Sequence, residues 1–215
     1  MIKNNYSKQS VLFISLIIGI VLTTFFQNCG QSSSDEFEAS TTIGNNDSLV
    51  QKELLDKGKE IARHINSSLI NTLMLEINKK GFEDAIAFCS LNAIPITDSI
   101  SKINEVSIQR VSHKSRNVNN EANETELQII NQFRKENERK HPVIISGNGN
   151  STFYAPIYIV SPLCIKCHGK VDSDIQPEVY KTILAKYPFD KATGFEINEL
   201  RGLLKIVFDK KTEIK

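Results

Sequence analysis

The run Cys164-Ile165-Lys166-Cys167-His168 constrains this chain more than any other part of its sequence. Two cysteines three positions apart, with a histidine directly after them, form the pattern for covalent attachment of c-type haem. The two thiols can form thioether bonds to the vinyl groups of the haem, and the adjacent imidazole then reaches the iron as an axial ligand. We therefore predict one covalent haem c, bound by Cys164, Cys167 and His168.

Two other kinds of site use a Cys-x-x-Cys pair: a redox disulfide and half of a zinc site. A thioredoxin-like disulfide needs the pair where a strand turns into a helix within a βαβ pattern, whereas here Gly169 and a polar loop follow. A zinc site needs a second pair of ligands, and the only other cysteine of the predicted domain is Cys89. Haem attachment is the favoured interpretation, and the disulfide and zinc sites stay open as alternatives.

Residues 1–28 are typical of an export signal. Lys3 and Lys8 form a short basic start, and Val11–Phe26 is an uncharged, mostly apolar run of 16 residues. A membrane-spanning helix needs about 20 such residues, so the run is better suited to the apolar segment of a signal peptide. Cys29 follows this run and resembles the lipidated first residue of a bacterial lipoprotein.

Three interpretations of this start remain open: a lipoprotein anchored through Cys29, a retained N-terminal anchor, or another export signal. Phe26 and Asn28 stand where Leu and a small residue are usual in lipoproteins. All three place the rest of the chain outside the cytoplasm, and the first attaches it to a bacterial membrane on the periplasmic side. Residues 29–48 are rich in Ser, Asn, Thr and acidic residues and predict a flexible tether.

The composition suits a globular domain over residues 49–215. Apolar residues make up 40% of the chain and charged residues 24%, so most of it can bury a core and disorder is not expected. The 26 basic residues nearly balance the 25 acidic ones. A nucleic-acid partner needs a basic stripe to neutralise phosphates, so this balance argues against one.

The pattern of apolar residues predicts an α+β domain with an antiparallel sheet, a long N-terminal helix and inserted helices. Gly81 should break the first helix and Pro95 should limit the second. A turn at residues 147–150 should join two strands in a hairpin. Helices are expected over 49–80, 82–91, 121–140 and 176–186, and strands over 106–111, 143–145, 153–160 and 203–208.

Five stretches along the predicted domain resemble, in the same order, a family of single-haem c-type cytochromes with a PAS-like fold. This domain is also found as the extracytoplasmic sensor of some bacterial histidine kinases. The stretches are Ala85–Ile96, Arg110–Asn120, Phe153–Ile159, Cys164–Lys170 and Tyr187–Gly202. The chain departs from the family pattern at Val118, where Pro is usual, and at His113, where a longer aliphatic residue is usual.

The resemblance implies a PAS-like sheet and a role for Cys89. In this family the second axial ligand of the haem is often a cysteine thiolate in the segment that matches Ala87–Ser90. A thiolate favours ferric iron and lowers the reduction potential. Apart from the resemblance, a lone cysteine on an apolar helix face is usually a small buried hydrophobe.

Other side chains could also contribute to a haem site. Arg110, Lys114 and above all Arg116 are candidates to pair with haem propionates, because guanidinium groups bind carboxylates bidentately; otherwise they form an exposed basic turn. His113 is either an alternative sixth ligand or a solvated residue. Two tyrosines on predicted strands, Tyr154 and Tyr158, either line the pocket or pack in the core. Two histidines, His64 and His141, are expected at the surface.

Three functions fit these features, and they differ in what happens at the sixth ligand position. A redox or ligand sensor would exchange its thiolate ligand, and because no kinase domain follows in this sequence, it would signal to a separate protein partner. A simple periplasmic electron carrier would keep its ligands, and a lipid tether would suit it. An enzyme such as a peroxidase needs an open iron site and a distal base, so a non-enzymatic role is expected. Whether the long first helix pairs with a second copy to form a homodimer stays open.

Overall fold

A computed structural model of the chain describes residues 45–135, 141–147 and 149–209. The predicted signal and Cys29 lie outside these ranges. The described residues form α1 (Asn45–Asn104), β1 (Ser107–Val111), the 3-10 helix η1 (Val118–Asn120), α2 (Glu124–Arg134), β2 (Val143–Gly147), β3 (Asn150–Tyr158), α3 (Pro162–His168), α4 (Pro177–Lys186) and β4 (Leu200–Phe208). No helix within the described ranges is long and apolar enough to cross a bilayer.

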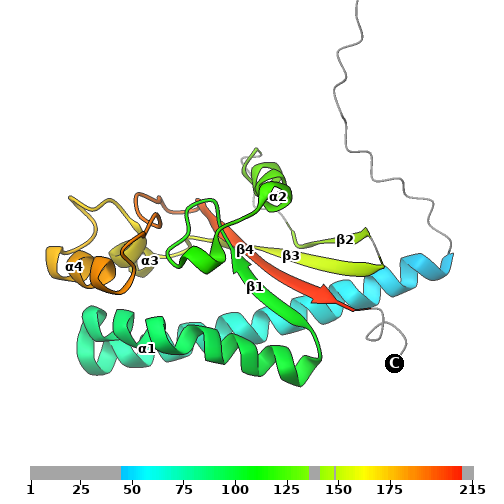
Figure 1. The fold of residues 1–215 in the computed structure, drawn as a ribbon, viewed down its shortest axis with the longest axis horizontal. Coiled ribbons are helices and arrows are strands. Elements are labelled where there is room, and N and C mark those ends of the chain that lie inside the picture. Colours follow the sequence, from blue (N-terminus) through cyan, green and yellow to red (C-terminus); the bar gives the residue numbers. More distant parts are fainter. Residues whose placement is uncertain (1–44, 136–140, 148, 210–215) are drawn as a thin grey trace, which may run out of the picture. The chain divides into compact units, whose positions relative to one another are not determined.

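The helix α1 consists of two arms that meet at Gly81, which has φ 87° and ψ −175°. This conformation is open to glycine and strongly disfavoured for other residues. The arms lie side by side in Figure 1, and Ile65 of the first arm shares a core cluster with Ile100 of the second. The predicted break at Gly81 is confirmed, and it turns the chain back on itself.

The prediction that Pro95 limits the second helix is wrong, because this arm continues to Asn104. A proline inside a helix removes one hydrogen bond and costs about 3 kcal/mol. Ile96 and Ile100 follow Pro95 and pack into the core, and burying an isoleucine contributes about 1.5–3 kcal/mol. Packing of two such side chains therefore offsets the cost of the proline.

The four strands form one antiparallel sheet in the order β1-β4-β3-β2. The predicted hairpin is confirmed, since β2 and β3 pair from Gly147 opposite Asn150 onward. The strand β4 lies between β1 and β3. Its side chains pack into two core clusters, one on each face of the sheet. Leu204, Ile206 and Phe208 pack on the α1 side, whereas Leu203 packs on the α2 side. Figure 1 shows the same arrangement, with α1 below the sheet and α2 above it.

The helix α2 begins later than predicted, at Glu124 rather than Glu121. Asn123 caps it, with its side chain accepting from the Glu126 amide and Glu126 accepting from the Asn123 amide. Such a capping box fixes where a helix starts. Its periodic apolar residues predict a buried stripe of Leu127, Ile130 and Phe133. Ile130 and Phe133 are buried accordingly, but Leu127 is 37% exposed. Residues 136–140, the end of the predicted helix, lie outside the described ranges.

The sheet and its helices bring the loop after β1, α3, α4 and the segment before β4 to one end of the sheet. The helix α4 ends at Lys186 as predicted, since the residue before a proline is excluded from the helical region. It packs on the turn of α1 through a cluster of Ile86, Ile175, Val179 and Ile183. Figure 1 shows α3 and α4 together beside the turn of α1. The predicted α+β class is thus confirmed.

Candidate functional site

The motif residues lie on a short helix that the sequence pattern did not indicate. Pro162 occupies its first turn, where a missing amide has no cost. Residues three and four apart share one face of a helix, so Cys164 has both Cys167 and His168 as neighbours. Cys164 packs against a cluster containing Phe195, and Cys167 packs against the cluster between α1 and α4. Both are free thiols.

The imidazole of His168 is held by one backbone oxygen. Its Nδ1 lies 2.8 Å from the carbonyl oxygen of Ala192. A carbonyl can only accept a hydrogen bond, so Nδ1 carries the proton and Nε2 presents its lone pair. Burial, followed by the nearby charges of Arg116 and Arg201, lowers the pKa of His168 well below its ordinary value. The ring is therefore neutral, which is the form that binds a metal.

Arg116 lies in the loop after β1 and connects α3 to the segment that precedes β4. Its Nη2 donates to the carbonyl oxygens of Cys167 at 2.6 Å and Ala192 at 3.3 Å. Its Nε and Nη2 also donate to the two carboxylate oxygens of Asp190, at 3.1 and 3.2 Å. The predicted pairing of Arg116 with a haem propionate stays a prediction, but the contacts present bind it to the backbone around His168.

Cys89 lies on the second arm of α1 and faces this end of the sheet. It is half-buried, and its thiol interacts electrostatically with that of Cys167. Burial raises the pKa of the Cys89 thiol, and the charges of Arg110 and Arg116 oppose that rise. Arg110 is itself largely buried, and Tyr187 and Cys89 interact with it. The fold thus brings Cys89 near the motif, although Cys89 lies 75 residues before Cys164 in the sequence.

His113 lies near the motif, where its ring packs on Phe195. Both of its ring nitrogens are buried without a hydrogen-bond partner, and burial together with Arg134 and Arg201 lowers its pKa from 6.5 to about 4. Its ring packs edge-on against Phe195, with centroids 6.0 Å apart, and the ring of His168 packs on the same Phe195 at 6.3 Å. The expectation of a solvated residue is wrong, since the ring nitrogens are buried.

The other candidate residues fall into three places. Lys114 stacks over Phe195, with Nζ 4.4 Å from the ring centroid, and donates to the carbonyl oxygen of Thr193. Tyr154 packs in the core on the α2 side, with Tyr158 against the same cluster, which favours their interpretation as core residues. His64 and His141 are exposed, as predicted.

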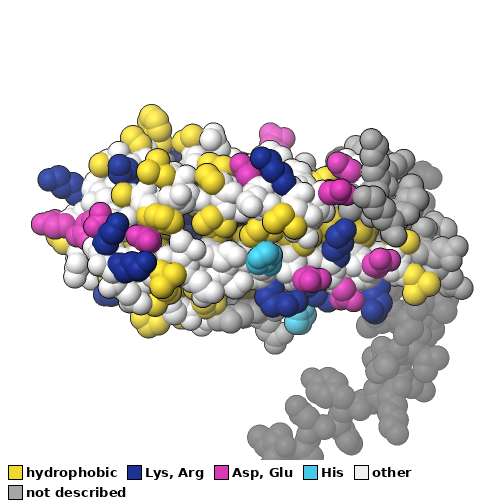
Figure 2. Space-filling model, turned by 90° about the horizontal axis from the view of Figure 1, so that it is seen from below, with side chains coloured by type: hydrophobic (Ala, Val, Ile, Leu, Met, Phe, Trp, Pro, Cys, Tyr) yellow, Lys and Arg dark blue, Asp and Glu magenta, His cyan; other side chains and the backbone are white. Residues whose placement is uncertain are grey.

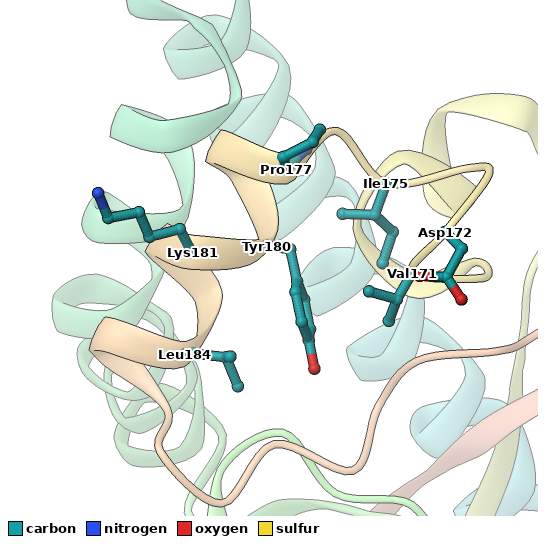
Figure 3. A pocket seen from close by; sticks show the side chains of 7 residues that line it. All are labelled: Val171, Asp172, Ile175, Pro177, Tyr180, Lys181 and Leu184. Carbon is teal, nitrogen blue, oxygen red and sulfur yellow. The ribbon is translucent and has the colours of Figure 1, made fainter.

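An open hollow of about 490 Å³ lies between α4 and the loop that precedes it (Figure 3). The ring of Tyr180 extends into it, with Ile175 and Val171 on one side and Leu184 on the other. Tyr180 and Cys167 both pack against the cluster that contains Ile175. Cofactor pockets are commonly apolar hollows of about 300–1,000 Å³, so this hollow has the size of such a pocket, but its lining does not include the motif residues.

These residues fit a c-type haem. Two free thiols on one helix face can form the thioethers, the Nε2 lone pair of His168 can bind iron, and a third thiol lies nearby. A zinc site fits less well, because within the described ranges no three or more His, Cys, Asp and Glu side chains are grouped to hold a metal ion. Two free thiols would also serve a redox disulfide, which stays an alternative.

Sequence reasoning missed three residues of this site: Asp190, Ala192 and Phe195. Asp190 acts through its buried carboxylate, Ala192 acts through its backbone carbonyl and amide, and Phe195 is buried. All three lie within Tyr187–Gly202, a stretch that carried the family resemblance. A buried acid preceding a small residue gives no local signal, so only the resemblance of the whole stretch could have pointed to them.

Known proteins show where this chain belongs. The computed structure is similar to the crystal structure of the cyanobacterial heme-protein Tll0287, with a TM-score of 0.58 and 20% identity over 74% of this chain and 96% of that one. This likeness supports the PAS-like fold expected from the sequence. No curated protein matches the chain. The model of the Tll0287-like family matches residues 45–208, which confirms the resemblance found in the sequence. The chain belongs to the Tll0287-like family.

Proposed function

We propose that this chain is an exported monohaem c-type cytochrome that acts in redox or ligand sensing. The observation that carries the proposal is the arrangement on α3, where two free thiols share a face with an imidazole whose Nε2 is directed away from its hydrogen bond to Ala192. When bound, the haem would supply one-electron chemistry at its iron. The relative crystallised under the name heme-protein supports the same cofactor.

We further propose Cys89 as the second axial ligand. It comes from α1, an element separate from α3, and its thiol interacts with that of Cys167. The positive charges of Arg110 and Arg116 favour its thiolate. His113, the alternative ligand, packs on Phe195, a ring that His168 also contacts. Two side chains that pack on the same ring are poorly placed to bind opposite faces of one iron, so the geometry favours Cys89.

A sensing role follows from this ligand pair. A thiolate binds ferric iron well and ferrous iron poorly, because reduction adds electron density to the metal. Cys89 would therefore leave on reduction and let another ligand bind, and a partner protein would detect the change. A thiolate that fills the position in the ferric form also argues against an enzyme. If Cys89 stays bound in both states, the chain is instead an electron carrier.

The haem itself is tested by expressing the chain with the c-type maturation system. We expect a haem stain that survives denaturing electrophoresis, and the double change Cys164→Ala with Cys167→Ala should abolish it. Cys89→Ala is the matched control, since a cysteine that only ligates iron should leave the stain intact. Haem that extracts into acidified organic solvent would show that it is not covalently attached.

Binding of carbon monoxide distinguishes a sensor from an electron carrier. Carbon monoxide binds ferrous haem only, and we expect it to bind the reduced protein because reduction would free the position that Cys89 occupies. A reduced protein with both ligands retained and no carbon monoxide binding would identify an electron carrier.

A further inference from the structure

The backbone of Ala192 holds His168 in place, and two charged side chains in turn hold that backbone. The Ala192 carbonyl oxygen accepts from Nδ1 of His168 and from Arg116, and the Ala192 amide donates to Asp190 at 2.9 Å. We infer that Arg116 and Asp190 are positioning residues for His168, which set the orientation of its imidazole toward the haem. The inference rests on the proposed function.

Asp190 is suited to this role because its carboxylate is completely buried, with 0% of the side chain exposed. One of its oxygens, Oδ1, accepts from both Arg116 Nε and the Ala192 amide. The other oxygen accepts from Nη2 of the same guanidinium. A buried carboxylate with a charged donor on each oxygen and an amide donor on one of them has its orientation fixed, and it restrains the Ala192 backbone that it binds.

Arg116 completes the arrangement from the other side. Its side chain is only 14% exposed, and its planar group contacts Asp190, the Ala192 carbonyl and the carbonyl of Cys167 at the end of α3. One side chain therefore links the helix that carries His168 to the peptide that orients it. Lysine carries the same charge but has no planar fork, so it could not make these contacts together.

Further backbone bonds hold the same segment against α3. The amide of Phe195 donates to the His168 carbonyl at 2.9 Å, and that of Gly194 donates to the Gly169 carbonyl at 2.7 Å. The amide of Lys191 donates to the Ser115 carbonyl, next to Arg116, at 2.9 Å. These bonds fix the two ends of the segment, and the Arg116–Asp190 pair fixes its centre at Ala192.

The further hydrogen bonds of this ion pair go to the backbone around His168. A buried ion pair repays the cost of removing its charges from water only if further hydrogen bonds satisfy both partners. Here those bonds go to the carbonyl of Cys167 and to the amide and the carbonyl of Ala192. Partners that hold the second nitrogen of a histidine ligand fix its tautomer and ring orientation. Arg116 and Asp190 hold Ala192, whose carbonyl is that partner of His168.

The test uses the full chain in two forms, produced with and without the c-type maturation system. In the form without haem, nitrogen-15 NMR should detect a slowly exchanging proton on Nδ1 of His168. Arg116→Lys and Asp190→Asn should speed its exchange about tenfold or more, the effect of weakening a charge-assisted hydrogen bond. Glu121→Gln is the matched control, because it removes an acid from the exposed Lys191–Glu121 pair nearby without touching the Ala192 peptide.

In the form with haem, Arg116→Lys should shift the reduction potential and the ferric electron paramagnetic resonance spectrum, whereas Glu121→Gln should shift neither. Arg116→Lys decides the matter because it keeps the charge, so a purely electrostatic role predicts no shift. The double variant should shift the potential no further than the larger single change, because the two residues bind each other and act together on the backbone of Ala192.

The outcomes separate this inference from the proposed function. If haem attaches and Arg116→Lys leaves both the exchange and the spectrum unchanged, positioning by this pair is overturned and the haem assignment stands. If the Nδ1 proton is protected and responds to both changes but no haem attaches, the haem assignment fails. The positioning of His168 by Arg116 and Asp190 then stands. Should Asp190→Asn fail to fold, Arg116→Lys alone answers the question.

Discussion

The thiol of Cys89 is subject to two opposing influences. Burial raises its pKa, and the positive charges of Arg110 and Arg116 act in the other direction. Binding to iron would favour the thiolate, because a thiol that coordinates a metal is deprotonated outright. A cysteine that only packs in the core would gain nothing from two nearby positive charges. The ligand role of Cys89 is therefore the hypothesis that we test.

We predict that Cys89→Ala opens the sixth position of the haem. The ferric spectrum should become partly high-spin, and the reduction potential should rise by on the order of 100 mV, within the roughly 0.8 V range that axial ligands span. Optical spectroscopy with potentiometry measures both. His113→Ala is the control and should leave the ferric spectrum low-spin. If Cys89→Ala leaves the spectrum unchanged and His113→Ala alters it, the assignments of the two residues are reversed.

We predict that His113 makes folding sensitive to acid. Its pKa is lowered from 6.5 to about 4 by burial, with Arg134, Arg201 and Lys114 adding to the effect and Glu199 opposing it. Between these two values the unfolded chain binds the proton that the folded chain excludes, so stability falls as pH falls from about 6.5 toward 4 and is constant above that window. The loss should be about 1–2 kcal/mol, less than the full shift because the side chain keeps some solvent contact.

The measurement is urea unfolding at pH 7 and pH 5, for the chain and for His113→Gln. The variant should lose less stability than the parent on acidification, since glutamine does not titrate. An equal loss in both would assign the acid sensitivity to other groups.

At the scale of elements, α1 depends on a single residue for its shape. Gly81 has a backbone conformation that side chains strongly disfavour, and this conformation places the two arms on one core. Without it, Ile65 and Ile100 could not share a cluster. The position of Cys89 beside α3 therefore depends on Gly81 as well.

We predict that Gly81→Ala destabilises the fold by about 1–3 kcal/mol, the usual cost of forcing a side chain into such a conformation. Urea unfolding should detect this as a lower midpoint. Gly147→Ala is the matched control, because a Cβ at Gly147 meets no atom within 4 Å and the residue does not have a positive φ. Equal midpoints for the two variants would contradict a special role for Gly81.

At the scale of the whole molecule, α1 leaves apolar side chains exposed. Figure 2, viewed from the α1 side, shows hydrophobic side chains in a band along the middle of this face, with charged groups on either side. The large hydrophobic side chains of α1 that are exposed include Leu49, Ile70, Leu75, Leu91, Ile94 and Ile103. Whether α1 pairs with a second copy of the chain stays open, and sedimentation of the full chain would answer it.

We predict that the chain is attached to a membrane through Cys29. Cys29→Ser should block incorporation of labelled fatty acid and leave an unprocessed precursor, because the lipid is transferred to the thiol before the signal is cleaved. Ser32→Ala, nearby in the same polar segment, is the control and should mature normally. Normal processing and unchanged membrane partitioning of Cys29→Ser would reject the lipoprotein interpretation in favour of a retained anchor or another export signal.

The sequence by itself determined the features that depend on neighbouring residues. Gly81 ends a helix, the pair Tyr187 and Pro188 ends α4, and the turn at residues 147–150 forms a hairpin, each for a reason contained within a few positions. The Cys-x-x-Cys-His pattern belongs to the same class, because its chemistry lies in five consecutive residues. The signal for the start of α2 is also local, but the prediction missed it: the capping pair at Asn123 and Glu126 starts the helix later than the helical pattern of residues suggests.

Only the tertiary structure decided what holds the motif and what faces it. The carbonyl that orients His168 lies 24 residues further along the chain, and Arg116 reaches the carbonyl of Cys167 from 51 residues before it. The continuation of α1 past Pro95 likewise depends on a core formed with β3 and β4. Partners so far apart are chosen by how the sheet and its helices pack, because no local preference extends beyond a few residues, and that packing brings Cys89, Arg116, His168 and Asp190 to one end of the sheet.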